Sequence, residues 1–78
     1  MLVLDIEASG LISEKHSIVS LGALDLENPS NRFYAECRIW DGAHIEPQAL
    51  EVNGFTEAEI TDKNKMTEEE LIRNFIGW

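Results

Sequence analysis

The sequence has little cysteine, few basic residues and no long apolar run. Cys37 is the one cysteine among 78 residues, which excludes a disulfide within the chain and favours a reducing, cytoplasmic location. No apolar stretch approaches the roughly 20 residues that cross a bilayer, so no membrane contact is expected. The start at Met1 lacks the basic lead-in of a signal peptide, and none is expected. With 44% hydrophobic residues, the composition is typical of a folded domain.

The shortage of basic residues restricts the possible functions. Six Lys and Arg residues stand against 15 Asp and Glu residues, and the formal net charge is −9. Proteins that coat nucleic acid present basic surfaces, so this role is not expected. A nuclease is still compatible with the charge, because bound divalent cations can supply positive charge at a phosphate.

Three segments have the residue pattern of β-strands: residues 2–7, 17–26 and 32–39. The turn-forming residues 28–31 lie between the second and third segments. This arrangement predicts that the second and third strands form an antiparallel hairpin.

The first strand is apolar except for two acids. Alternation places Leu2, Leu4 and Ile6 on one face, and Asp5 and Glu7 on the other. Such a strand suits a position between two neighbours, but the sequence offers only one obvious partner. An unpaired apolar edge promotes association, so a homodimer or another contact through this edge is one expectation.

Helical signals follow the strands. Pro47 suits a first helical turn and Gly54 suits a helix end, which predicts a helix over residues 47–53. Two further helix starts are predicted by capping-box pairs, Thr56 with Glu59 and Thr67 with Glu70. After the second pair, apolar residues recur at helical spacing at positions 71, 72, 75 and 76. The sequence therefore predicts an α/β fold in which two or three short helices follow a three-stranded antiparallel sheet.

Asp5 and Glu7 form a pair of carboxylates on one strand face. Their repulsion is relieved by a hard divalent cation such as Mg²⁺, which binds few carboxylates together with waters and phosphate. Ser9 and Gly10 follow directly, where backbone amides can approach a phosphate or a sugar. The alternative is a solvated strand face, because the Asp-x-Glu spacing is not specific and recurs at residues 25–27. The apolar surroundings of the first pair favour a site.

Three stretches of the sequence, taken in order, resemble the DEDDh 3′–5′ exonucleases. Residues 5–11, Asp-Ile-Glu-Ala-Ser-Gly-Leu, are similar to the family's first motif, Asp-x-Glu-x-Thr-Gly-Leu, with Ser9 in place of the threonine. Residues 17–23 resemble the family's second strand, and residues 45–56 resemble its segment Ile-x-Pro-x-Ala…Gly-Ile-Thr. The resemblance implies a partial ribonuclease H-like fold. Residues 1–78 would be the N-terminal part of a single exonuclease domain, with the C-terminal strands and helices missing.

The resemblance also implies roles for individual residues. Asp5 and Glu7 would be catalytic metal ligands in a site that holds two Mg²⁺ or Mn²⁺ ions in the intact domain. The substrate would be the single-stranded 3′ end of DNA or RNA, with Leu11 against its terminal base. The substrate-binding residues implied in this way are Ser9, Gly10, Leu11, Asn53 and Phe55.

The family's later motifs have no counterpart in this sequence. The family requires two further aspartates and a histidine five residues before the last of them, as a general base. His16 and His44 lack that context and are expected at the surface, and Asp62 is expected in a solvated loop. The chain alone is therefore expected to be inactive. The alternatives are a non-catalytic acidic interaction or assembly module, a decayed exonuclease remnant, and a partial fold completed by a separate chain.

Overall fold

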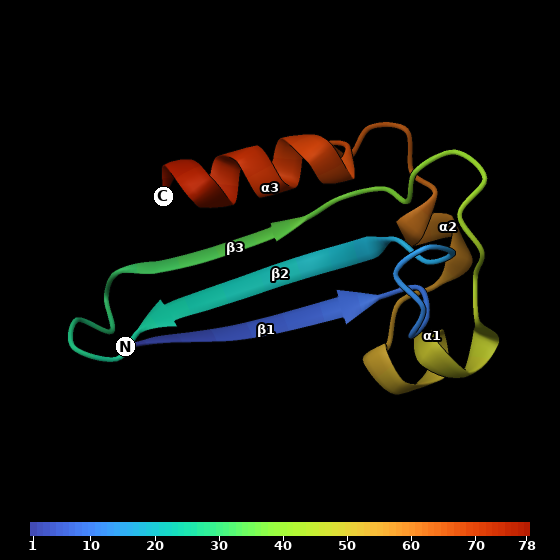
Figure 1. Cartoon of the computed structure of the whole chain (residues 1–78). Coiled ribbons are helices and arrows are strands. Elements are labelled where there is room, and N and C mark those ends of the chain that lie inside the picture. Colours follow the sequence, from blue (N-terminus) through green and yellow to red (C-terminus); the bar gives the residue numbers. More distant parts are fainter.

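A three-stranded antiparallel sheet runs through the molecule, and three helices follow it in the chain (Figure 1). The computed structural model describes the whole chain, Met1–Trp78. The strands, in the order β1-β2-β3 across the sheet, are β1 (Leu2–Ala8), β2 (Ile18–Asp25) and β3 (Arg32–Glu36). The helices are α1 (Pro47–Asn53), α2 (Glu57–Ile60) and α3 (Glu68–Gly77). The predicted mixed α/β class, the antiparallel sheet and the β2–β3 hairpin are confirmed. None of the helices has the length and apolar character needed to cross a membrane.

The third strand is shorter than its residue pattern predicted, because it ends at Glu36 and not at residue 39. The backbone amide of Arg38 donates to the Met66 carbonyl at 2.8 Å, and the amide of Ile39 donates to the Ile60 carbonyl at 2.9 Å. Backbone groups inside a fold need partners, and here the partners come from segments far along the chain. The alternation of apolar and polar residues in the strand gives no information about these distant hydrogen-bond partners.

Local signals fix the helix ends where the sequence placed them. The Thr56 and Thr67 side chains each accept a hydrogen bond from the backbone amide of the glutamate three residues later. The side chain of that glutamate accepts from the threonine backbone amide, which completes each predicted capping box. Pro47 is the first residue of α1, and Gly54 closes the helix with a left-handed φ of 81°.

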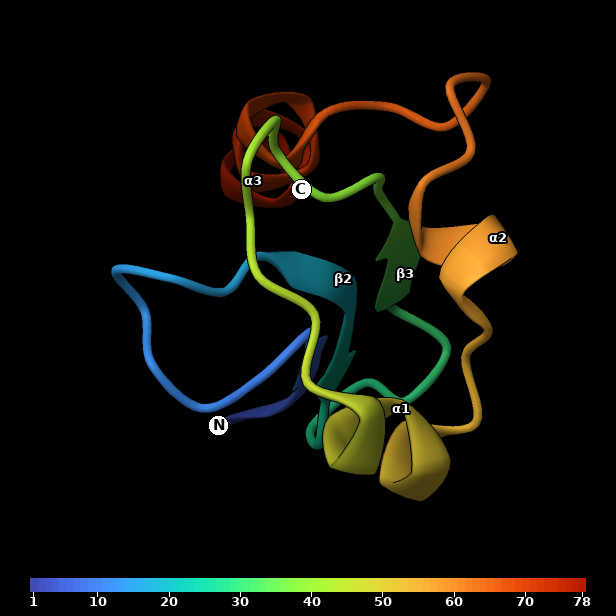
Figure 2. The same ribbon diagram turned by 90° about the vertical axis from the view of Figure 1, so that its right-hand side faces the viewer.

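The core lies between α3 and one face of the sheet. Figure 2 shows α3 on one side of the sheet and α2 on the other. Leu71 of α3 is fully buried together with Leu21 and Cys37. The Glu68 carboxylate at the start of α3 accepts from the Ile18 amide at 2.7 Å, which ties this helix to β2. Because only 10 of the 78 residues are buried, each core side chain carries a large share of the stability.

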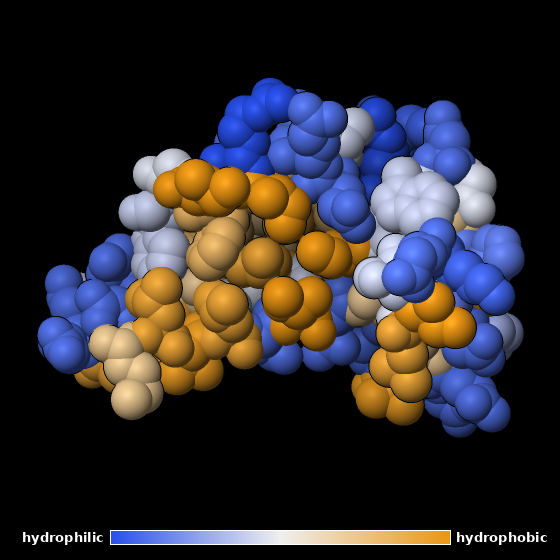
Figure 3. Space-filling model, in the orientation of Figure 1, coloured by the Kyte–Doolittle hydropathy of each residue, from blue (hydrophilic) through white to orange (hydrophobic).

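β1 forms an open edge of the sheet, because it pairs only with β2. In the ladder Leu4 lies beside Ala23 and Ile6 lies beside Leu21, so these β1 side chains are on the α3 face. α3 does not cover them: Leu2, Leu4 and Ile6 are 53%, 49% and 49% exposed. Figure 3 shows the resulting apolar surface along the sheet beside α3.

Candidate functional site

Asp5 and Glu7 lie on the second face of the sheet, away from α3. Asp5 is paired with Gly22 and Glu7 with Ser20, and side chains two residues apart on a strand share a face. Asp5 is exposed and Glu7 is half-buried. Neither acid belongs to any of the four ion pairs of the chain. The two carboxylates therefore have no internal cation to relieve their repulsion.

Ser9, which follows β1, is fully buried and joins three segments. Its hydroxyl donates to the His44 carbonyl at 2.8 Å and accepts from the Ser17 amide at 3.0 Å. Its own amide donates to the Ser17 carbonyl at 2.8 Å, and its carbonyl accepts from the Glu46 amide at 2.7 Å. All of its polar groups are used within the fold, so Ser9 holds the end of β1 in place.

The two residues after Ser9 differ strongly in exposure. Gly10 is buried against the His16 ring, and a Cβ atom built at Gly10 would lie 2.2 Å from Cδ2 of that ring. The ring itself is held by the Ile12 amide, which donates to its Nδ1 at 3.1 Å. Leu11 is 100% exposed. In the turn after β1, a tightly packed glycine is therefore followed by a leucine whose side chain is open to solvent.

The segment that contains α1 returns to the end of β1. Asn53 Nδ2 donates to the Ala8 carbonyl at 3.2 Å, and Asn53 Oδ1 accepts from the Phe55 amide at 3.1 Å. An open hollow of about 390 Å³ lies between α1 and the end of β1. Four of the site residues predicted from the sequence line it: Glu7, Gly10, Leu11 and Asn53. Asp5 lies outside this hollow, farther along β1.

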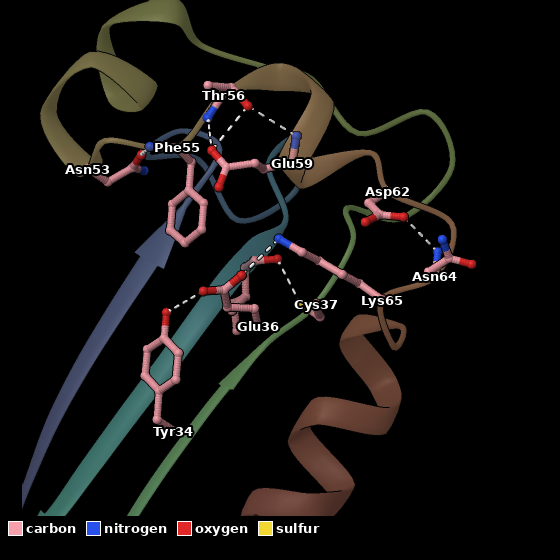
Figure 4. A network of polar contacts seen from close by, with 11 residues as sticks. Tyr34, Glu36, Cys37, Asn53, Phe55, Thr56, Glu59, Asp62, Asn64 and Lys65 are labelled. Atoms are coloured by element: carbon pink, nitrogen blue, oxygen red, sulfur yellow. Dashed lines mark hydrogen bonds and ion pairs between the residues drawn. The ribbon is translucent and has the colours of Figure 1, made fainter.

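A polar cluster that the sequence did not reveal occupies the second face of the sheet (Figure 4). Tyr34 Oη donates to Glu36 Oε2 at 2.7 Å, and Lys65 Nζ donates to Glu36 Oε1 at 2.8 Å. Lys65 Nζ also lies 5.5 Å from the centre of the Phe55 ring. Tyr34 and Glu36 are two positions apart on β3, so strand alternation places them on one face. Their position relative to β1 and the approach of Lys65 depend on the strand register and on a distant loop.

The strand register sets this cluster beside the two acids. The two cross-strand rows are Asp5, Gly22, Tyr34 and Glu7, Ser20, Glu36. Partial burial raises the pKa of Tyr34, and the hydrogen bond to Glu36 and the nearby Glu7 carboxylate raise it further. The hydrogen bond from Lys65 lowers the pKa of Glu36. This face therefore combines a phenol donor, an ion pair and two acidic side chains that no basic side chain pairs with.

The two histidines meet near the end of β1. Their rings lie edge to face with centres 6.2 Å apart. His44 is exposed, as expected from the sequence, whereas His16 is half-buried over Gly10. Asp62 lies in a turn in which its carboxylate accepts from the Asn64 amide at 2.9 Å. Neither histidine is followed five residues later by an aspartate, as the general base of the family is.

Comparison with known proteins gives no assignment for this arrangement. No family model matches the chain, and no curated protein is significantly similar to it. No group of three or more His, Cys, Asp or Glu side chains is arranged to hold a metal ion. The pair of acids predicted from the sequence, Asp5 and Glu7, therefore has no third such side chain beside it in a metal-binding arrangement.

We expect Ser9→Ala to lower the free energy of unfolding by about 1–3 kcal/mol. The substitution leaves the buried Ser17 amide and the partly buried His44 carbonyl without their hydrogen-bond partner. Urea unfolding followed by circular dichroism measures the change. Ser13→Ala is the control, because Ser13 is exposed, and it should change the free energy by less than about 0.5 kcal/mol. Equal changes in the two variants would show that the buried hydroxyl does not join these segments.

Proposed function

We propose that this chain is the N-terminal part of a metal-dependent 3′–5′ exonuclease domain of the DEDDh type, with a ribonuclease H-like fold. One observation carries the proposal: two of the three stretches that resemble the family, residues 5–11 and 45–56, meet at the end of β1. The Glu46 amide donates to the Ser9 carbonyl at 2.7 Å. The Asn53 side chain donates to the Ala8 carbonyl, which lies 45 positions earlier in the chain. A shared site explains why both stretches carry residues of the family pattern.

The two acids fit a hard divalent cation such as Mg²⁺ or Mn²⁺. Asp5 and Glu7 share a strand face, and no basic side chain of the chain pairs with them. Mg²⁺ sites typically use one or two carboxylates together with waters and substrate phosphates. When bound, such ions activate the attacking water and stabilise the leaving oxygen in phosphodiester cleavage. Asp5 and Glu7 would hold them on this chain's side of the site.

The terminal nucleotide of a single-stranded DNA or RNA 3′ end would lie in the hollow between β1 and α1. Leu11 presents a fully exposed apolar side chain that suits contact with the terminal base. The Asn53 side chain is held against β1 and lines the same hollow. Phe55 lies two positions later in the chain. Ser9 would act by fixing the turn that carries Leu11, because its own polar groups are already bonded within the fold.

The chain provides only one half of this chemistry. The family's second and third aspartate motifs are not found in it, and neither histidine precedes an aspartate by five residues. A general base for the attacking water is therefore not among these residues. The cleavage activity would belong to a larger domain, in which this chain would anchor the metal and the terminal base.

We expect Asp5→Asn and Glu7→Gln each to weaken Mn²⁺ binding at least about tenfold, equal to about 1.4 kcal/mol. Each substitution removes one of the two negative charges that face the cation. A Mn²⁺ titration followed by paramagnetic broadening of backbone amide signals measures both affinity and position. In the unchanged chain, the first signals to broaden should come from the two acids and from Gly22 and Ser20, which are paired with them.

The matched control is the second Asp-x-Glu pair, Asp25 with Glu27. Asp25→Asn with Glu27→Gln removes the same number of charges as Asp5→Asn with Glu7→Gln. The Asp25 carboxylate accepts from the Glu27 amide at 3.0 Å in a turn, and Glu27 lies 3.8 Å from the amino group of Met1. If the control double variant lost as much Mn²⁺ binding as the β1 double variant, general surface charge would explain the binding and the proposal would fail.

A second candidate function is a non-catalytic interaction or assembly module, which would also suit a decayed exonuclease. The open edge of β1 favours it, because Leu2, Leu4 and Ile6 are about half exposed on the core face. The Mn²⁺ titration separates the two functions, since an assembly module needs no cation at Asp5 and Glu7.

A further inference from the structure

Asn53 and Gly54, at the end of α1, are two neighbouring residues that can react with each other. Asn53 is the one asparagine of the sequence that is followed by glycine, whereas the other asparagines precede Pro, Arg, Lys and Phe. Because Gly54 has no side chain, its backbone nitrogen approaches the Asn53 side-chain amide freely in a flexible chain. A reaction between two groups of the same chain is fast once the reacting atoms are aligned.

The reaction open to this pair is deamidation. The Gly54 nitrogen loses its proton to solvent and forms a bond to Cγ of Asn53, while the bond from Cγ to Nδ2 breaks and Nδ2 leaves as ammonia. Water then adds to one of the two carbonyl carbons of the resulting cyclic imide and breaks the bond from that carbon to the Gly54 nitrogen. The product is either aspartate or isoaspartate, in which the main chain runs through Cγ. Water is the only reactant that is taken up.

In the fold, hydrogen bonds hold the atoms that would react. The Gly54 nitrogen donates to the Leu50 carbonyl at 2.8 Å, where Gly54 closes α1 with its left-handed φ of 81°. Asn53 Nδ2, the atom that leaves, donates to the Ala8 carbonyl at 3.2 Å (Figure 4). Asn53 Oδ1 accepts from the Phe55 amide at 3.1 Å. The attacking nitrogen therefore keeps its proton and the side-chain amide keeps its orientation until this helix end opens.

We propose that Asn53 is a site of spontaneous deamidation that the fold holds closed, and that the reaction releases the C-terminal end of α1 from β1. The atom that is lost is the donor to the Ala8 carbonyl, and the carboxylate oxygen that replaces it cannot donate. In isoaspartate the main chain is also one carbon longer, which displaces the Gly54 amide from the Leu50 carbonyl. A single local opening thus becomes permanent. The proposal depends on the hydrogen bonds of this chain and not on the proposed function.

The modified residue lies at the hollow between α1 and the end of β1. Asn53 and Glu7 both line this hollow. Deamidation removes the side-chain contact that holds the end of α1 against β1, and it adds a negative charge at a hollow that already contains a carboxylate. Both changes favour the open arrangement, because like charges repel. The age of the chain, and not a ligand, therefore decides whether the hollow stays formed.

Peptide mass mapping of the chain over several days at neutral pH measures the reaction, because deamidation exchanges NH for O and raises the mass of the peptide that contains Asn53. In about 8 M urea this peptide should change at least about tenfold faster than in buffer, where a closed state favoured by about 1.4 kcal/mol slows the reaction tenfold. The peptides with the other asparagines should change far more slowly. Equal rates at Asn53 in buffer and in urea, or no change there in urea, would overturn the proposal.

Ala49→Gly and Ala58→Gly distinguish opening of the α1 end from unfolding of the whole chain. Ala49 lies in α1 and Ala58 lies in α2, and a glycine weakens the helix that contains it. In buffer, Ala49→Gly should speed deamidation of Asn53 about fivefold, while Ala58→Gly should change the rate by less than about twofold. In urea both variants should react like the unchanged chain. Equal acceleration in buffer by the two variants would show that the α1 end does not control the reaction.

Amide hydrogen exchange tests the release of α1. The Gly54 amide should exchange at least about tenfold faster in the aged chain and in Asn53→Asp than in the fresh chain. Asn31→Asp is the matched control, because Asn31 is exposed and the substitution adds the same charge, and it should leave this exchange unchanged. Unchanged exchange of the Gly54 amide in the aged chain, or equal changes in the two variants, would overturn the proposed release. The Mn²⁺ titration of Asp5 and Glu7 is a separate measurement, so either proposal can fail without the other.

Discussion

Leu71→Ala is expected to lower the free energy of unfolding by about 2–5 kcal/mol. Leu71 is fully buried, and it packs with Leu21, Ala23 and Cys37 in a cluster that joins α3 to the sheet. A domain of this length has a total stability of about 4–12 kcal/mol, so this one truncation removes a large part of it. The reason is that a cavity left in so small a core has few neighbours able to close it.

Ile76→Ala is the matched control for this substitution. Ile76 belongs to the same helix and was predicted from the sequence to share its apolar face, but it is 78% exposed. Its truncation should change the free energy of unfolding by less than about 0.5 kcal/mol. Urea unfolding can be followed by tryptophan fluorescence, to which Trp40 and Trp78 both contribute. The Trp78 ring lies 6.1 Å from the Phe33 ring and 6.0 Å from the Phe75 ring. Equal shifts of the midpoint in the two variants would show that α3 is not anchored through Leu71.

The chain is expected to lose about 2–3 kcal/mol of stability between pH 9 and pH 11 through Cys37 alone. Burial raises the pKa of its thiol from the ordinary 9.0 to about 11, the Glu68 carboxylate adds to the increase, and Lys65 opposes it. The thiol donates to the Ile18 carbonyl at 3.1 Å, so the folded state holds the neutral form. Because the folded pKa is the higher one, this stabilisation is complete below pH 9 and is lost as the pH rises toward 11.

Cys37→Ala isolates this contribution. Tyrosine and lysine side chains titrate over the same pH range in both proteins, so the difference between the two pH profiles reports the thiol. At pH 7 the variant should be somewhat less stable, because a buried side chain becomes smaller. Toward pH 11 the two stabilities should converge as the thiol loses its advantage. Parallel profiles from pH 8 to pH 11 would mean that the Cys37 thiolate is not excluded from the core.

The candidate site combines features that were predictable with features that were not. The alternation of β1 placed Asp5 and Glu7 on one face, and the ladder has them there. The burial of Ser9 was not predictable, because it depends on the Ser17 amide and the His44 carbonyl, which approach from other segments. The same holds for the polar cluster on that face. Its tyrosine and glutamate stand in one strand, but the lysine that binds them comes from the loop before α3.

The sequence by itself determined the local structure of this chain. The alternation of its strands, the proline that starts α1 and the two capping boxes act between residues a few positions apart, and all of them appear in the fold. The tertiary structure alone decided where the third strand ends and which residues stand beside the two acids. These outcomes depend on hydrogen bonds and packing between segments far apart in the chain, and no short-range residue pattern encodes such contacts.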